Sequence, residues 1–271
     1  GQDISRTEIA NVPGLTRTAI FGIARALLAE GLVTVHRTSA KLKGQPVHNL
    51  RLNPNVAFGL GLDIGQDHLT LVAIDFVGEI RFRHHLPARF ASPTEIRRFV
   101  SDGLLQIQSQ NLVPMSKVTG IGVAISDIPG RGVSNAVNIP ELLRDLLDLR
   151  IRQESDAASA AIGEMSFGRG LNLESFFYVF IGAAGLGGGL VIDRRYVRGA
   201  HGRSGEIGFL PQLNPLRSSQ TNFQKTLGDA ILISDLLDDF RSLGFKSVSI
   251  ETIERLSGAD AIIHRWVARV A

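Results

Sequence analysis

Four short motifs between residues 63 and 208 constrain the fold of this chain more than any other feature of its sequence. Two carry carboxylates, Asp63-x-Gly65 and Glu154-Ser155-Asp156, and two are rich in glycine, Gly182–Gly189 and Gly199–Gly208. A glycine-rich turn lets backbone amides approach a phosphate, but tight hairpins use the same residues, so one such turn is weak evidence. The four motifs together are far more specific than any one of them.

The segments around these motifs alternate between strand-like and helix-like patterns. Two apolar strands flank the Asp63-x-Gly65 turn as a hairpin, and Gly78 permits a third strand. Gly182–Gly189 is predicted to be a turn between two strands. Strands and helices mixed along one chain indicate the α/β class. The predicted strands are 58–65, 69–75, 79–85, 118–125, 176–181 and 190–193, and the predicted helices are 93–110, 142–149 and 157–164.

The first fifty residues predict two helices separated by a short turn. Ser5-Arg6-Thr7-Glu8 has the pattern of a capping box, and Pro13-Gly14 ends the short helix that would follow. Thr16 then caps a second helix, and Gly31 suits the left-handed position after its end. This order is typical of a helix-turn-helix. The apolar residues of the second helix fall on one face and are Ile20, Ile23, Ala24, Leu27 and Leu28.

A strand pair follows these helices, at 32–36 and 47–52, with a polar, basic segment between them. A hairpin after a recognition helix is a wing, and Lys41 and Lys43 near its tip would meet phosphates. Thr16, Arg17 and Thr18 at the start of the second helix would point at the major groove. The alternative is a small helical domain that binds protein. Two residues on the outer side of the helix, Phe21 and Gly22, count against strong DNA binding.

Charge is concentrated in the N-terminal segment. Residues 1–52 carry a net charge of +4, whereas the remaining 219 residues sum to −1. Basic charge confined to one small segment indicates an anionic partner for that segment, or an ordinary solvated face. Asn53-Pro54-Asn55 is the natural boundary. We expect a DNA-binding domain at 1–53 and two lobes of a second domain at 56–150 and 151–271.

Composition excludes several classes of protein. The chain of 271 residues has no cysteine, which excludes disulfides and thiolate metal sites. It has no apolar run of about 18 residues and no signal segment, so we expect no membrane partner and a cytoplasmic location. Because the chain begins with Gly1 and Ala271 falls inside a helical pattern, we expect that pieces are missing at both ends.

The chain resembles the ROK family of repressors and sugar kinases from about Ser5 to its end. Leu62-Asp63-Ile64-Gly65 is similar to the family's first phosphate-binding turn, and Gly185-Leu186-Gly187-Gly188-Gly189 to its second. Glu154-Ser155-Asp156-Ala157 resembles the family's Glu-Asn-Asp-Ala, whose Asp is the general base of the kinases. Gly199–Gly208 resembles the stretch that ends in a sugar-binding Glu and a metal-binding His.

This resemblance implies a winged helix-turn-helix followed by a two-lobed, actin-like ATPase (ribonuclease H-like) domain, incomplete at its C-terminus. Ser5–Ala10 and Gly14–Leu32 look like the family's DNA-binding helices, and Gly44-Gln45-Pro46 looks like its wing motif, with Gln45 where Arg is usual. The expected DNA-binding residues are Ser5, Arg6, Thr16, Arg17, Thr18, Arg25, Lys41, Lys43 and Gln45.

Departures from the family pattern affect the phosphate and metal sites. Kinase members continue the first turn with Gly-Thr-Lys, where this chain has Gln66-Asp67-His68. Asp67 would place a carboxylate near the triphosphate, and like charges about 4 Å apart repel by about 1 kcal/mol in water. Ala184 replaces a Thr before the second turn, and Phe209 replaces the metal-binding His. We therefore expect degenerate phosphate turns at Asp63, Gly65, Gly185, Gly187 and Gly188, with no zinc or other cofactor and with ATP binding disfavoured.

The sugar pocket implied by the resemblance is partly kept. Asp156 would accept a hydrogen bond from a sugar hydroxyl, or would cap the helix at 157–164. The loop that usually brings an Asn to the sugar is short, so either Asn135 or Asn138 could take that place. His201 fits a turn residue better than a ligand. The expected sugar-binding residues are Asn138, Glu154, Ser155, Asp156 and Glu206.

Together these features predict a transcriptional regulator, most simply a repressor of sugar-utilisation genes, with a sugar-sensing and non-catalytic second domain. Its partners would be double-stranded operator DNA, a sugar or sugar derivative, and a second copy of the chain. A ROK sugar kinase with an appended DNA-binding domain is the enzyme alternative. A regulator that binds DNA but has lost its sensor is a third hypothesis.

Overall fold

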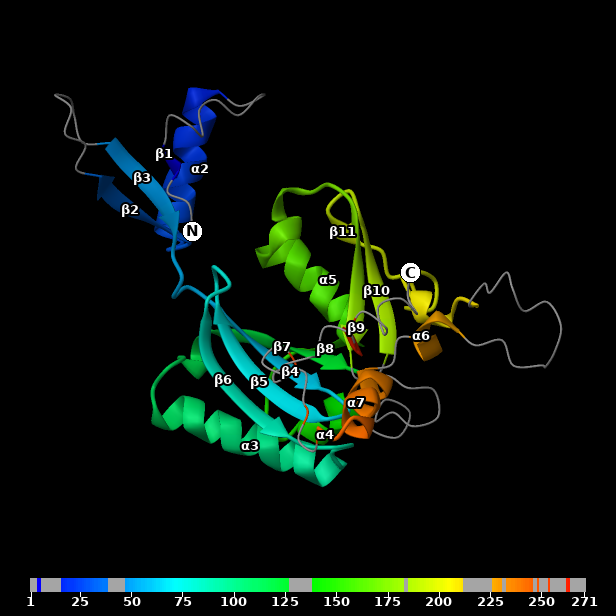
Figure 1. Cartoon of the computed structure of the whole chain (residues 1–271). Helices are drawn as coiled ribbons and strands as arrows, with labels where there is room; N and C mark the ends of the chain where they lie inside the picture. The colour runs from blue at the N-terminus through cyan, green and yellow to red at the C-terminus, as the bar shows by residue number, and fades with distance from the viewer. Residues whose placement is uncertain are drawn as a thin grey trace.

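The structure is a computed structural model, shown in Figure 1, and it describes most of the chain. The described residues are 4–5, 16–38, 47–126, 138–182, 185–211, 226–230, 233–245, 248, 253 and 262–263. The predicted first helix and the tip of the predicted wing lie outside them.

In the N-terminal unit, the described residues form helix α2 and a three-stranded antiparallel sheet. Helix α2 (Arg17–Ala29) is capped by Thr16, whose hydroxyl accepts from the Ala19 amide at 3.2 Å, as predicted. Gly31 adopts the predicted left-handed conformation, with φ +70°. The strands β1 (Ile4–Ser5), β2 (Val33–Thr38) and β3 (Val47–Leu52) run in the order β1-β3-β2, and β1 was not predicted.

The core of this unit lies between α2 and the hairpin. Ala24, Val33 and Leu50 form it, with Leu27 and Leu28 packed alongside. Ile23, which was predicted to lie on the same apolar face of the helix, is 48% exposed. Ile23 sits at the edge of the apolar stripe, and the small Ala24 makes the contact with the sheet.

Residues 58–155 form a five-stranded mixed sheet in the order β6-β5-β4-β7-β8. The hairpin strands pair antiparallel and β7 and β8 add in parallel, which requires the crossover helix α3 (Pro93–Ser109) between β6 and β7. Alternate residues of β4 and β5 are buried, which is the period-two pattern of a strand. The strands are β4 (Phe58–Ile64), β5 (His68–Asp75), β6 (Ile80–Pro87), β7 (Val118–Ile125) and β8 (Ile151–Ser155), and η1 (Met115–Lys117) precedes β7.

A second sheet has the order β11-β10-β9 and packs against helix α5 (Asp156–Phe167). In Figure 1, α3 and α4 (Ile139–Leu143) lie on one side of the large sheet, and α5 with the second sheet lies on the other. This α/β arrangement places the end of β8 and the start of α5 between the two sheets. The remaining elements are β9 (Phe176–Gly182), β10 (Gly185–Ile192), β11 (Arg195–Tyr196), η3 (Arg169–Asn172), η4 (Ile207–Phe209), α6 (Leu227–Ala230) and α7 (Ile233–Ser242).

The predicted helix 142–149 was wrong. Asn138 and Pro140 start the helix earlier, at Ile139, and it ends at Leu143. Beyond Leu143 the Leu146 amide donates to the Leu143 carbonyl at 3.1 Å, as in a turn, and Arg97 donates to the Leu142 carbonyl at 2.8 Å. Strand β8 was not predicted, because its sequence is mostly polar and shows no alternation of apolar residues.

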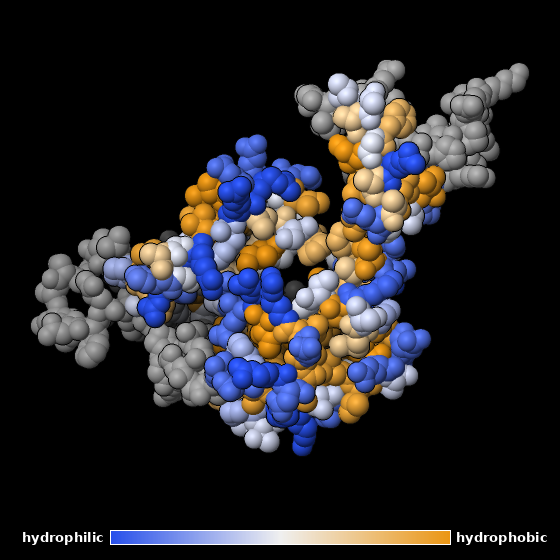
Figure 2. Space-filling model, turned by 180° about the vertical axis from the view of Figure 1, so that it is seen from behind, coloured by the Kyte–Doolittle hydropathy of each residue, from blue (hydrophilic) through white to orange (hydrophobic). Residues whose placement is uncertain are grey.

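The N-terminal unit stands apart from the rest of the molecule. Figure 2 shows it joined to the body through a narrow waist, with apolar side chains exposed on both parts. On α2, the side chain of Phe21 is 57% exposed. Within the described ranges, no helix is both long and apolar enough to cross a membrane.

Candidate functional site

Two adjoining pockets lie where the ends of β7 and β8 and the start of α5 meet the loop at 198–206. Ser155 and Glu206 line both. The narrower pocket has a volume of about 50 Å³ and includes Asp156. The wider one, about 240 Å³, is polar and is lined from one side by β8 and from the other by the 198–206 loop. Four of the five predicted sugar-binding residues therefore come together here.

Asn138 does not join this group. Its side chain caps α4, accepting from the Glu141 amide at 3.3 Å, and it lines neither pocket. Asn135, the other candidate for this role, lies outside the described residues.

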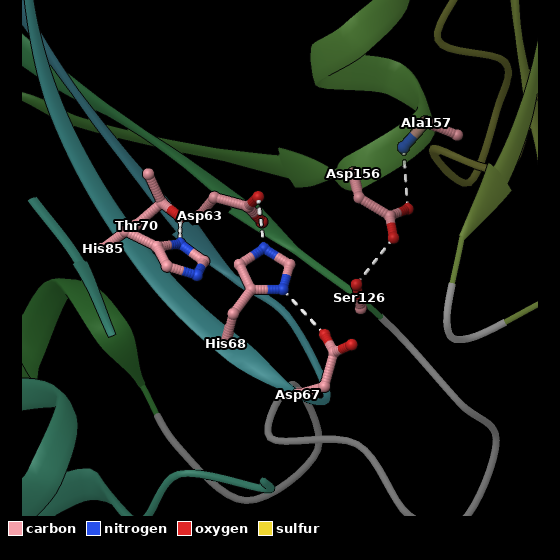
Figure 3. Close-up of polar contacts among 8 residues, drawn as sticks. All are labelled: Asp63, Asp67, His68, Thr70, His85, Ser126, Asp156 and Ala157. Carbon is pink, nitrogen blue, oxygen red and sulfur yellow. Dashed lines mark hydrogen bonds and ion pairs between the residues drawn. The ribbon is translucent and has the colours of Figure 1, made fainter. Parts of the chain in front are cut away.

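Asp156 is a half-buried carboxylate of the narrower pocket (Figure 3). It accepts hydrogen bonds from the Ser126 hydroxyl and the Ala157 amide, both at 2.7 Å. Burial raises the pKa of Asp156, these two hydrogen bonds oppose the rise, and the nearby Asp63 adds to it. The helix cap is Ser155, which accepts from the Ala158 amide at 3.1 Å, so the alternative that Asp156 is the cap was wrong. Asp156 also lines the narrower pocket.

The turn after β4 is closed by a histidine between two aspartates. His68 contacts Asp63 through Nε2 at 3.0 Å and Asp67 through Nδ1 at 2.7 Å (Figure 3). The hydrogen bond to Asp63 raises the pKa of His68 to about 9, against the opposing effect of burial, and Asp67 adds to the rise. A Cβ placed on Gly65 would overlap the His68 ring, which shows that the imidazole fills the space over the turn.

The second predicted phosphate turn is mostly strand. Gly185, Gly187 and Gly188 lie in β10, which pairs with β9 from Gly185↔Gly182 onward, so the prediction of a turn over Gly182–Gly189 was wrong. These glycines permit close packing. A Cβ on Gly188 would lie 2.7 Å from the Gly205 carbonyl oxygen, and one on Gly187 would lie 3.0 Å from Ala157 Cβ. Ala184 lies outside the described residues.

Glu154 faces a basic loop across the wider pocket. It pairs with Arg198 at 3.2 Å, and Arg203 and His201 line the same pocket. Sequence reasoning did not select either arginine, because both sit in a glycine-rich stretch that was interpreted only through Glu206. The available signal was a pair of arginines, one inside the Gly199–Gly208 motif and one directly before it.

A larger hollow of about 450 Å³ lies at the junction with the N-terminal unit and not beside these carboxylates. Pro54 and Leu52 line one side of it, and Asp75 lies on the other. Asp75 already accepts from Arg81 at 2.7 Å and from two backbone amides. Burial opposes ionisation of Asp75, but these hydrogen bonds outweigh it and hold its pKa below the usual range. This hollow is a seam between two units, and its buried carboxylate, Asp75, is already paired with Arg81.

The predicted DNA-binding residues are only partly within the described chain. Thr16, Thr18 and Arg25 are exposed on α2, while the side chain of Arg17 lies outside the described set. Ser5 ends β1 opposite Asn49. Arg6, Lys41, Lys43 and Gln45 lie outside the described residues. Among the residues that the structure does describe, no group of three or more His, Asp or Glu is placed to hold a metal.

A mixed sheet joined by α5 to a second, glycine-rich sheet, with carboxylates between them, is the architecture of actin-like sugar kinases. The family model described as "ROK family" matches residues 59–222, so the chain belongs to the ROK family. The xylose repressor of Caldicellulosiruptor bescii is 28% identical over 218 residues, which cover 76% of this chain and 54% of the repressor. The chain thus spans about half the length of that relative.

Two solved structures share the fold. A ROK family transcriptional regulator, described as a homologue of the E. coli MLC protein, aligns with a TM-score of 0.64 and 20% identity, over 98% of this chain and 74% of its own. The ROK hexokinase of Thermus thermophilus aligns with a TM-score of 0.56 and 22% identity, over 79% of this chain and 73% of its own. Regulators and kinases therefore both occur among proteins of this fold.

Proposed function

We propose that this protein is a DNA-binding transcriptional regulator, a repressor of sugar-utilisation genes, whose ROK domain senses a sugar without phosphorylating it. The N-terminal unit carries the proposal. A capped helix packs on a hairpin through Ala24, Val33 and Leu50, and its outer side presents Thr18 and Arg25 to solvent. That arrangement suits a winged helix-turn-helix, in which the second helix enters the major groove and the hairpin meets the backbone.

The alignments support the same proposal. The regulator structure aligns over 98% of this chain and the hexokinase over 79%, a difference about the size of residues 1–53. The relative from Caldicellulosiruptor bescii is named a xylose repressor. We infer a cytoplasmic homodimer on a palindromic operator, in which a sugar between the lobes shifts the spacing of the two recognition helices.

The His68 bridge supports the absence of kinase chemistry. Phosphoryl transfer requires the protein to neutralise the charge of the phosphates. The turn after β4, which resembles the family's first phosphate-binding turn, instead holds two carboxylates and one imidazolium, a net charge of −1. The residues present do not suit ATP, and we propose that neither ATP nor zinc is a cofactor.

DNA binding is tested by fluorescence anisotropy on the region upstream of the protein's own operon. We expect specific binding that weakens steeply with salt, because phosphate contacts release counterions. Arg25→Ala and Lys43→Ala should each weaken binding, and Arg195→Ala, exposed on β11, should not. Equal affinity in all variants would contradict the proposed contacts, and no binding would contradict the function.

The kinase alternative is favoured by the fold shared with the hexokinase. It predicts that ATP-magnesium and a hexose yield a sugar phosphate. Formation of that product by the purified chain would overturn the non-catalytic proposal. Stabilisation by no sugar of a thermal-shift panel would favour instead a regulator without a sensor.

A further inference from the structure

Helix α2 turns one face to the core of its unit and the opposite face to solvent. Ile20 and Ala24 lie on the inner face and are buried. Thr18, Phe21 and Arg25 recur at helical spacing on the other face, and all three are exposed. The side chain of Phe21 is 57% exposed. The outer face of α2 therefore presents a phenyl ring between a threonine and an arginine.

Gly22 leaves open space beside the Phe21 ring. A Cβ built on Gly22 would have no described atom within 4 Å, apart from its chain neighbours and the backbone of the helix itself. Glycine lowers helix stability relative to alanine, and no close packing requires it at this position. A helix that lacks a side chain here can bring its backbone, together with the adjacent ring, close to a partner.

The charge of the helix favours nucleic acid as that partner. The sequence of α2 contains two arginines, Arg17 and Arg25, and no carboxylate. Residues 1–52 as a whole carry a net charge of +4. A surface of this sign attracts the phosphates of DNA, and the major groove is wide enough to admit an exposed helix.

Few side chains of this helix can read bases by hydrogen bonds. The sequence of α2 contains no Asn, Gln, Lys or His, and the hydroxyl of Thr16 already accepts from the Ala19 amide as the helix cap. In the major groove, however, thymine also presents a C5 methyl group, which apolar side chains such as phenylalanine contact. Cytosine carries only hydrogen at that position. An exposed phenyl ring can therefore distinguish the two pyrimidines without a hydrogen bond.

We propose that Phe21 determines operator specificity by contacting C5 methyl groups of thymine in the major groove. Thr18 and Arg25, on the same face, would contact bases or phosphates on either side of the ring. This inference rests on the proposed DNA-binding function and names the base that the centre of α2 reads. Phe21 and Gly22 add no phosphate contact, so they contribute to the choice of base and not to non-specific affinity.

The test changes the DNA and leaves the protein as it is. In a specifically bound duplex from the region upstream of the operon, each thymine is replaced in turn by deoxyuridine, which lacks only the C5 methyl group. Fluorescence anisotropy then measures the affinity of the full chain. We expect a loss of about fourfold for each methyl group that Phe21 contacts, because burial of one such group favours binding by about that factor.

Variants then assign this loss to Phe21. Phe21→Ala should bind the thymine and deoxyuridine duplexes equally at the sensitive positions, whereas Phe21→Leu, which keeps an apolar side chain, should retain part of the difference. Ile23→Ala is the matched control, because Ile23 is also exposed, at 48%, but lies on a different side of α2. It should keep the full difference. Circular dichroism of the three variants checks that they fold.

The outcomes separate this inference from the proposed function. Specific binding with no loss at any deoxyuridine, or a loss that persists in Phe21→Ala, would overturn the inference and leave the DNA-binding function intact. If Phe21→Ala binds every duplex as the wild type does but no longer forms dimers in analytical ultracentrifugation, the outer face contacts another copy, which would also overturn it. If the wild-type chain binds no duplex specifically, the DNA-binding function itself fails, and the inference fails with it.

Discussion

His68 contacts a carboxylate through each of its ring nitrogens, and only the protonated imidazole can donate both hydrogen bonds. Sequence reasoning identified Asp67 as a carboxylate that would repel a triphosphate, but not its partner. The turn brings His68 back over Gly65 and between Asp63 and Asp67, a geometry that depends on the β4–β5 register. That ATP is disfavoured at this turn remains a prediction, and the structure adds that Asp67 is paired with His68.

The bridge predicts a specific dependence of stability on pH. The pKa of His68 is raised to about 9 in the fold, against about 6.5 unfolded. Its stabilisation is therefore complete below about pH 6.5 and is lost as pH rises through about 9. His68→Gln should lower the free energy of unfolding by about 1 kcal/mol at pH 6 and remove this loss. Urea unfolding of both proteins at several pH values measures it.

The matched control is His36→Gln. The His36 side chain is exposed on β2 and has no hydrogen bond or ion pair among the described residues. This variant should keep the wild-type pH dependence. A wild-type profile that is flat between pH 6.5 and 9 would show that the bridge does not form in solution.

At the scale of elements, strands and helices with regular apolar patterns could be predicted from the sequence. The secondary structure of the glycine-rich segment could not. β7 has the predicted bounds, and β4, β5, β6 and α3 differ from theirs by one or two residues, because these patterns of apolar residues are local. The glycines of β10 look the same in sequence whether they form a turn or a closely packed strand. Contact with α5, about thirty residues away in the chain, decides between the two.

This contact predicts a marked sensitivity at Gly189. A Cβ there would overlap the Cβ of Ala161 on α5, so Gly189→Ala forces the helix away from the sheet. Overpacking of this kind costs about 1–3 kcal/mol. Thermal and urea unfolding should show a loss in that range.

Gly122→Ala is the control for this effect. Gly122 lies in β7, and a methyl group added there would have no atom of another residue within 4 Å beyond its chain neighbours. The substitution should therefore change stability by no more than about 0.5 kcal/mol. Equal effects at the two positions would contradict the packing explanation for the glycines of β10.

At the scale of the whole molecule, the link between the two units determines how a ligand could influence DNA. Asn53 donates from its side chain to the Gly31 carbonyl at 2.9 Å, just after α2. Asn55 receives a hydrogen bond from Lys117 at 2.8 Å on its carbonyl, next to β7. The Asn53-Pro54-Asn55 segment, chosen from sequence only as a boundary, thus contacts both α2 and the large sheet. Its composition predicted a turn, whereas its partners depend on the tertiary fold.

This link predicts that Asn53→Ala weakens the coupling between sugar and operator. Removing the side chain breaks the hydrogen bond to Gly31, so movement of the sheet is transmitted less directly to α2. Sugar affinity and operator affinity without sugar should stay within about twofold of wild type. The change in operator affinity caused by saturating sugar should fall by about threefold or more, within the usual range for coupling residues. Anisotropy titrations with and without the sugar measure all three quantities.

Asn172→Ala, at the end of η3 and far along the chain from this link, should leave the coupling unchanged. If Asn53→Ala retains full coupling, the signal passes between the units by another route, such as the seam lined by Pro54 and Asp75.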